Sequence, residues 1–250
     1  MKALVVANWK MNPRTLKDAK ALFAATKRAL VSARDVTLVI APPAVFLPTL
    51  AHGLRKGRIE FGIQNAHAEA GGAHTGEVSM QQAKEASASY VIIGHAERRA
   101  AGETDDDVRR KLAAASAAGL TPILCIGEAS RGAGAEHFAT VREQLHAAID
   151  GLPTAKVSKI VIAYEPVWAI GATKAMQPAQ MHEMSIFIRK AMVEKIGEAG
   201  HGAKVLYGGS IDAGNAAAML QGGDVRGLLV GRASTDAAVF KELLAAVDDA

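Results

Sequence analysis

Eight short apolar runs, each followed by a stretch with helical character, recur along the whole chain. These runs are residues 3–9, 36–42, 59–65, 89–95, 120–128, 159–166, 204–209 and 225–231. Their apolar residues are continuous instead of alternating with polar ones, which is typical of strands buried on both faces of a parallel sheet. Because eight strand–helix units follow one another without a linker, the sequence predicts an α/β protein: a closed (β/α)8 barrel that forms a single domain over residues 1–250.

The segments between the runs carry helix signals. In residues 17–30, the side chains that share one helical face are Ala19, Leu22, Phe23, Thr26 and Leu30. A second helix is expected to begin after the N-cap Thr104 and to end at Gly119. The competing fold is an open doubly wound sheet, which usually has fewer strands and a glycine-rich fingerprint after its first strand. The first run here ends in NWKMN, which lacks that fingerprint.

Composition narrows the classes of function. The formal net charge of +4 is spread along the chain, and no block of lysine and arginine suggests a nucleic-acid partner. The single cysteine, Cys125, excludes an intrachain disulfide and fits a reducing cytoplasm. No apolar run is long enough for a signal segment or a membrane span. We therefore expect a soluble, cytoplasmic protein with no nucleic-acid or membrane partner.

Polar residues gather where the expected strands end. In (β/α)8 barrels the carboxyl ends of the strands form the active site. The residues at these ends are Asn8, Lys10, Gln64, Asn65, His95, Glu128, Glu165, Gly208, Gly209, Ser210 and Gly231. No paired cysteines or histidines have metal-ligand spacing, so no metal site is expected. The absence of a G-x-S-x-G motif argues against a serine hydrolase.

Glu165 is followed by an apolar segment that could close over it as a lid. A lid would exclude water from the carboxylate, which favours the interpretation of Glu165 as a catalytic base. The alternative is a solvated carboxylate at a strand end. The expected lid comprises Pro166, Val167, Trp168, Ala169, Ile170, Gly171, Ala172, Thr173, Lys174, Ala175 and Met176.

Three further signals accompany Glu165. His95 comes directly before a possible helical turn, where free backbone N–H groups favour a neutral imidazole. Lys10 lies on the same side of an extended strand as Asn8 and needs a counter-charge, which a phosphate would supply. Glycines after the seventh and eighth runs suit a phosphate site made of backbone N–H groups. Each signal alone also fits a structural histidine, a surface lysine or an ordinary turn, but together they predict a small phosphorylated ligand.

Eight motifs, in order, resemble those of the triosephosphate isomerase family, and the similarity extends nearly from end to end. They are NWKMN (8–12), QN (64–65), HTGEVS (74–79), IGHAERR (93–99), CIGE (125–128), AYEPVWAIG (163–171), YGGS (207–210) and GLLVG (227–231). The resemblance implies a TIM barrel enzyme of glycolysis and gluconeogenesis. It would be an intramolecular oxidoreductase that interconverts dihydroxyacetone phosphate and D-glyceraldehyde 3-phosphate, with no cofactor and no metal.

The resemblance also implies roles for single residues. Glu165 is the base that moves a proton between two carbons, and neutral His95 is the electrophile that polarises the carbonyl. Lys10 and Asn8 stabilise the negative charge of an enediol(ate). Glu97 matches a buried acid of the family that positions Lys10.

The substrate phosphate is expected to bind the backbone N–H groups of Gly171, Ser210 and Gly231. Closure of the lid would keep water from the enediolate. Loop 71–79 resembles the family's dimer loop, and its Thr75 is expected to reach towards the site of the partner in a symmetric homodimer. An ordinary exposed loop is the alternative.

Three positions differ from the family pattern. Ala96 stands where serine is usual, so the missing hydroxyl could change the resting position of Glu165. Ala172 and Thr173 replace the usual start of the lid and would stiffen its tip. Arg232 stands where a second glycine is usual. If this position requires a glycine-only backbone conformation, or if the side chain crowds the phosphate, binding would suffer. The benign outcome is an ordinary φ with the arginine pointing to solvent, and a contact of Arg232 itself with the phosphate is the remaining alternative.

Two other interpretations stay open. Lys10 could form a Schiff base in an aldolase-like barrel enzyme. The chain could also be a phosphate-binding protein that has lost turnover through these departures, although a binding protein needs neither a base nor an electrophile.

Overall fold

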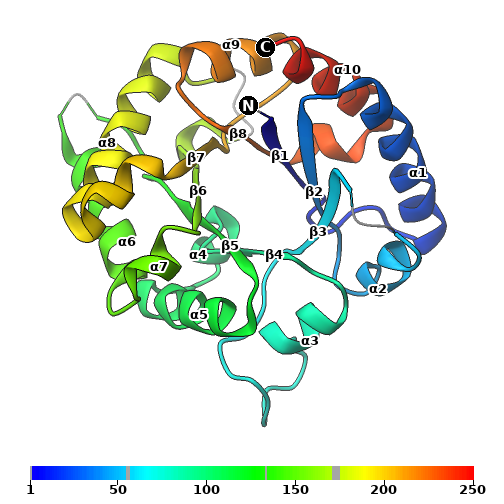
Figure 1. Cartoon of the computed structure of the whole chain (residues 1–250), viewed down its shortest axis with the longest axis horizontal. Helices are drawn as coiled ribbons and strands as arrows, with labels where there is room; N and C mark the ends of the chain where they lie inside the picture. Colours follow the sequence, from blue (N-terminus) through cyan, green and yellow to red (C-terminus); the bar gives the residue numbers. More distant parts are fainter. Residues whose placement is uncertain (1, 55–56, 133, 171–174) are drawn as a thin grey trace.

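The chain folds into a closed barrel of eight parallel strands, in which β1 pairs with both β2 and β8 (Figure 1). The computed structural model describes residues 2–54, 57–132, 134–170 and 175–250. The strands are β1 Ala3–Asn8, β2 Val36–Ala41, β3 Ile59–Ile63, β4 Tyr90–Ile93, β5 Thr121–Ile126, β6 Val161–Tyr164, β7 Lys204–Tyr207 and β8 Gly227–Val230. The predicted (β/α)8 TIM barrel is therefore confirmed. The apolar runs are longer than the strands because flanking residues such as Leu120, Ile160 and Val225 are also buried.

Helices surround the barrel on its outside, as Figure 1 shows. The α-helices are α1 Leu16–Ser32, α2 Leu47–Ala51, α3 Met80–Glu85, α4 Ala96–Ala100, α5 Asp105–Ala118, α6 Glu136–Ile149, α7 Thr154–Val157, α8 Pro178–Ile196, α9 Ala213–Gly222 and α10 Ala237–Asp248. Short 3-10 helices occur as η1 Val167–Ala169, η2 Gly197–Gly202 and η3 Arg232–Thr235. Both η1 and η3 lie directly beyond a strand end, where they shape the mouth of the barrel.

The helix signals of the sequence correspond to real helix faces and ends. All five side chains predicted for the inner face of α1 are buried. The hydroxyl of Thr104 accepts a hydrogen bond from the backbone N–H of Asp107, and the Asp107 carboxylate accepts one from the backbone N–H of Thr104. Gly119 ends α5 with a φ of +74°, a conformation that favours glycine.

Buried side chains form two layers, one on each face of the sheet. The larger layer lies between the strands and the surrounding helices. The smaller layer includes Leu4, Val39, Ile92, Ile123 and Leu206, which alternate along their strands with residues of the outer layer and therefore point into the barrel. Burial on both faces explains why the strands read as continuous apolar runs.

Candidate active site

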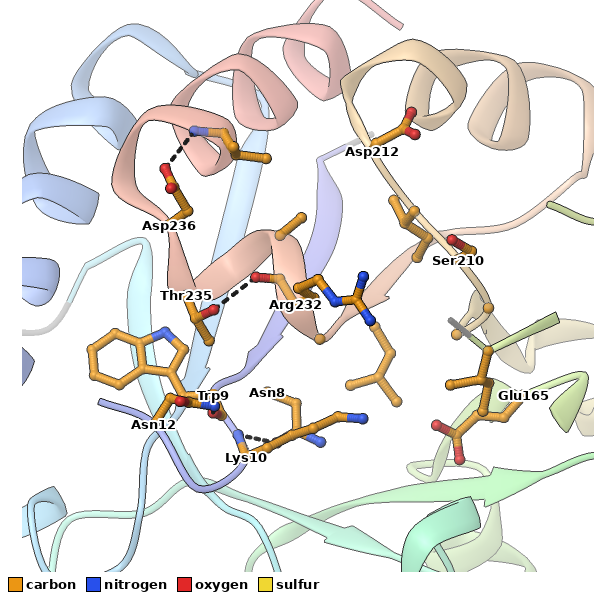
Figure 2. A pocket seen from close by; sticks show the side chains of 18 of the residues that line it. Asn8, Trp9, Lys10, Asn12, Glu165, Ser210, Asp212, Arg232, Thr235 and Asp236 are labelled. Carbon is orange, nitrogen blue, oxygen red and sulfur yellow. Dashed lines mark hydrogen bonds between the residues drawn. The ribbon is translucent and has the colours of Figure 1, made fainter. Parts of the chain in front are cut away.

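A pocket of about 690 Å³ opens at the carboxyl ends of the strands (Figure 2). It is lined by residues from the ends of β1, β4, β6, β7 and β8. Seven residues have catalytic or substrate-binding roles by the family resemblance, and six of them line the pocket together, namely Asn8, Lys10, His95, Glu165, Ser210 and Gly231. The seventh, Gly171, lies outside the described residues, as do Ala172, Thr173 and Lys174 of the expected lid.

Glu165 and His95 face each other at the bottom of this pocket. The Glu165 Oε1 atom lies 3.2 Å from His95 Nε2, and Glu165 Oε2 accepts a hydrogen bond from the backbone N–H of Ala96 at 3.0 Å. Only 3% of Glu165 and 6% of His95 is exposed. Residue 96 therefore holds the carboxylate through its backbone, although it lacks the hydroxyl that the family pattern provides.

The wall behind Glu165 is made of glycine because a side chain would not fit there. A Cβ atom at Gly208 would lie 2.9 Å from Glu165 Cγ, and one at Gly127 would overlap the Glu165 carbonyl oxygen. Cys125 lies in the inner layer of the barrel and is fully buried. Burial, together with the nearby Glu165 carboxylate, raises the pKa of the Cys125 thiol well above its usual value, so the thiol stays protonated.

His95 is the N-cap residue of α4, as the sequence suggested. Its Nδ1 atom accepts a hydrogen bond from the backbone N–H of Glu97 at 3.2 Å. Because a backbone N–H only donates, Nδ1 is the accepting ring nitrogen, which suits the tautomer that carries its proton on Nε2. The Nε2 atom faces Glu165. When substrate is bound, a substrate oxygen would replace the Glu165 carboxylate as the acceptor of the Nε2 hydrogen bond.

Lys10 adopts a left-handed backbone conformation, with a φ of +52°. Such a conformation is strained for a residue other than glycine and persists only where the surroundings enforce it. The Asn8 side chain accepts a hydrogen bond from the Lys10 N–H at 3.1 Å, and Gln64 Nε2 donates to the Lys10 carbonyl at 2.8 Å and to the Ala41 carbonyl at 2.9 Å. Gln64 was noted in the sequence only as a polar strand end, and its positioning contacts were missed.

Glu97 forms an ion pair with Lys10, with Oε1 2.5 Å from Nζ. The expectation of a buried acid is wrong for this chain, because 62% of the Glu97 side chain is exposed. Its position in the first turn of the short helix α4 leaves the side chain at the surface. Partial burial acts to raise the pKa of Glu97, but the hydrogen bond and charge of Lys10 outweigh it and hold the pKa below its usual value.

The start of the expected lid is tied to the barrel through Glu128. The Glu128 carboxylate is buried and accepts hydrogen bonds from Tyr164 Oη at 2.9 Å and from Trp168 Nε1 at 2.8 Å. The backbone N–H of Val167 donates to the Glu128 carbonyl at 3.0 Å. In the sequence Glu128 was one of several polar strand ends, and nothing there indicated that it anchors the residues that follow Glu165. At the far end of the expected lid, Met176 is buried.

The opposite side of the pocket consists of backbone donors and one arginine. The N–H groups of Ser210 and Gly231 donate no hydrogen bond within the described part of the chain. Asn215 Nδ2 donates to the Ser210 carbonyl at 3.0 Å and fixes this peptide. A Cβ atom at Gly231 would lie 3.3 Å from Lys10 Cε, so the lysine stem lies across this glycine. Arg232 lines the pocket and is exposed.

Loop 71–79 lies in the segment between β3 and α3, which extends away from the barrel in Figure 1. Thr75 is exposed near its middle. Among the described residues, no group of three or more histidine, cysteine or acidic side chains is arranged to hold a metal ion. None of the helices described has the length and apolar character needed to cross a membrane.

Comparison with known proteins gives a consistent family. The triosephosphate isomerase family model matches residues 3–247. The triosephosphate isomerase of Endomicrobium trichonymphae is 38% identical over 245 residues, which cover 97% of this chain and 98% of that protein. The enzyme of Idiomarina loihiensis is 41% identical and covers 93% and 92%, and that of Granulibacter bethesdensis is 41% identical and covers 96% and 97%. The chain belongs to the triosephosphate isomerase family.

Proposed function

We propose that this chain interconverts dihydroxyacetone phosphate and D-glyceraldehyde 3-phosphate through an enediol(ate), with Glu165 as the base and neutral His95 as the electrophile. The observation that carries the proposal is the facing pair itself. A carboxylate and an imidazole N–H lie 3.2 Å apart, nearly excluded from water, in the pocket that also contains the Lys10 ammonium.

The net change in the isomerisation is the movement of two protons, one from carbon to carbon and one from oxygen to oxygen. Glu165 takes a proton from the carbon beside the carbonyl, and the electron pair moves onto the carbonyl oxygen. His95 Nε2 donates a hydrogen bond to that oxygen, while Asn8 and the Lys10 ammonium stabilise its negative charge. The hydroxyl proton passes between the two oxygens, and Glu165 returns its proton to the neighbouring carbon. Atoms and charge balance without a cofactor.

The substrate phosphate binds on the opposite side of the pocket, where the N–H groups of Ser210 and Gly231 have no partner among the residues that the structure describes. Gly171 would complete this set but lies outside the described residues. Oriented backbone N–H groups are suitable phosphate ligands because they direct partial positive charges at the anion. The apolar residues after Glu165, of which Ile170 lines the pocket, would exclude water during the reaction.

We further propose that the chain acts as a symmetric homodimer in the cytoplasm, with residues 1–250 forming one catalytic domain. Loop 71–79, with its exposed Thr75, extends away from the barrel and would contact the partner. Met11, next to Lys10, is 91% exposed, and an apolar side chain beside the site is one that a partner subunit would cover. A role in glycolysis and gluconeogenesis follows from the family.

The decisive experiment is turnover of D-glyceraldehyde 3-phosphate in an assay coupled to a dihydroxyacetone phosphate-consuming enzyme. Wild type, Glu165→Gln and Glu143→Gln would be purified in parallel. Glu143 is an exposed residue of α6 and serves as the matched control. We expect rapid turnover by wild type and Glu143→Gln, and a loss of about 10²–10⁴-fold in kcat for Glu165→Gln. Equal turnover by all three proteins would contradict the assignment of the base.

An aldolase-like reaction through Lys10 is the second candidate, and the ion pair argues against it. A Schiff base requires an amine free to attack a carbonyl, whereas Lys10 Nζ is engaged in an ion pair with Glu97 Oε1 2.5 Å away. Borohydride added with dihydroxyacetone phosphate would trap a covalent adduct of Lys10, detectable by mass spectrometry, if that reaction occurred. We expect no adduct. Absence of both turnover and adduct, with inorganic phosphate still bound, would instead indicate a non-catalytic binding protein.

A further inference from the structure

Arg232 lines the pocket but has no role in the proposed mechanism. It begins η3 directly after Gly231, at the end of β8, and lines the same pocket as Glu165 and His95. In Figure 2 its side chain extends from the η3 side across the pocket, towards the side that carries Ser210.

The backbone accommodates an arginine at this position. Gly231 has a φ of −88°, and Arg232 is not among the described residues with positive φ. The concern that this site requires a glycine-only conformation is therefore removed. Arg232 thus begins the 3-10 helix η3 without the left-handed conformation that favours glycine.

The guanidinium has no protein counter-charge in the described part of the chain. No carboxylate there lies within 4.0 Å of it, whereas Arg99, Arg189 and other arginines form ion pairs. The two aspartates that line the pocket are engaged elsewhere, because Asp212 caps α9 and Asp236 caps α10 through hydrogen bonds to backbone N–H groups. An unpaired guanidinium directed into a polar pocket is suited to an anionic ligand.

We propose that Arg232 binds the phosphate group of the substrate. The phosphate then has a charged side-chain contact in addition to its contacts with the backbone N–H groups of Ser210 and Gly231. This inference rests on the proposed function, since it assigns a further binding residue for the same substrate. A guanidinium donates two parallel N–H groups to two phosphate oxygens, a contact that a lysine ammonium makes only as a point charge. Arg232 thus acts in substrate affinity.

The proposal is tested by separating affinity from turnover in four proteins. For wild type, Arg232→Gln, Arg232→Lys and Arg28→Gln, we would measure kcat and KM for D-glyceraldehyde 3-phosphate and the inhibition constant of inorganic phosphate. Arg28 is exposed on α1, so its variant removes the same charge far from the pocket. Thermal unfolding of each protein would establish that it is folded.

We expect Arg232→Gln to raise both KM and the phosphate inhibition constant about tenfold or more, with kcat changed by less than about threefold. The KM and phosphate inhibition constant of Arg232→Lys should lie between those of Arg232→Gln and wild type. This variant keeps the positive charge but loses the two parallel N–H donors of the guanidinium. Arg28→Gln should match wild type. An unchanged phosphate constant in Arg232→Gln would overturn the proposal.

Calorimetric titration with inorganic phosphate distinguishes this failure from failure of the proposed function. If wild type does not isomerise the substrate but Arg232→Gln weakens phosphate binding, the proposed activity fails and the Arg232 contact stands. If wild type isomerises and Arg232→Gln binds phosphate as tightly as wild type, the activity stands and the contact fails.

Discussion

The two sides of the pocket are built in different ways. On the side formed by the ends of β1, β4 and β6, hydrogen bonds from backbone N–H groups hold the functional groups of His95, Glu165 and Asn8. On the side formed by the ends of β7 and β8, the N–H groups of Ser210 and Gly231 are unpaired within the described residues, and the only cation from that side is exposed. We call these the proton-transfer side and the phosphate side.

The difference fits the roles that we propose for the two sides. Proton transfer requires donor and acceptor atoms within hydrogen-bond distance, and a displacement of about 1 Å can cost 10²-fold in rate. A phosphate group presents several equivalent oxygens and accepts donors from several directions. The phosphate side therefore tolerates a departure such as Arg232, whereas the proton-transfer side keeps its contacts even where Ala96 replaces the usual serine.

The largest effect is expected from removing the electrophile on the proton-transfer side. His95→Gln keeps a polar side chain but loses the imidazole fixed by the Glu97 N–H, so kcat should fall about 10²–10⁴-fold while KM changes little. Steady-state kinetics of the coupled reaction measure both. If this variant raised KM and left kcat intact, as we expect only of Arg232→Gln, the division into a proton-transfer side and a phosphate side would be wrong.

A smaller effect, on stability, is expected from the network at the start of the lid. Tyr164→Phe removes one of the two side-chain donors that Glu128 has among the described residues, and leaves a buried carboxylate with Trp168 alone. Burial and the adjacent carboxylate raise the pKa of the Tyr164 phenol, so it remains a donor at neutral pH. We expect the free energy of unfolding to drop by about 1.5–3 kcal/mol.

Urea unfolding of Tyr164→Phe and of the exposed control Glu143→Gln would measure this loss. A variant as stable as wild type would mean that Glu128 finds another donor, and that the proton-transfer side is less rigid than its contacts indicate.

Some features of the pocket could be predicted from the sequence, and others could not. The fold and the mouth residues were predictable, because burial on both strand faces gives continuous apolar runs and the carboxyl ends of parallel strands must meet. The contacts of Gln64 and Glu128 were not predictable from local sequence, since their partners are 23 to 54 and 36 to 40 residues away. The exposure of Glu97 was missed for a related reason, because it depends on where α4 begins.

Glu97→Gln tests the exposed edge of the proton-transfer side and should have a small effect. An exposed ion pair contributes about 0.2–1 kcal/mol, so the free energy of unfolding and kcat should change only slightly. The pKa of Glu97 is lowered in the folded protein, so its contribution is fully present above the unfolded value of about 4.3 and is lost as the pH falls through the lower folded value.

The stability difference between wild type and Glu97→Gln, measured by urea unfolding, should therefore be constant from pH 7 to about pH 5 and shrink at more acidic pH. A difference that instead grew on acidification would show that Glu97 is not held in its charged form by Lys10.

The smallest effect should come from Ser210→Ala, which sharpens the description of the phosphate side. No hydrogen bond of the Ser210 hydroxyl is found within the described residues, whereas its carbonyl is fixed by Asn215 and its N–H is free. If the phosphate binds the Ser210 N–H group, loss of the hydroxyl leaves that donor in place. KM should then stay within about twofold of wild type, because the lost hydroxyl would have bonded only to water. A tenfold rise in KM would mean that the hydroxyl itself contacts the phosphate. The phosphate side would then rely on side chains at two positions, Ser210 and Arg232, and its tolerance of substitution would be confined to residues that keep a donor.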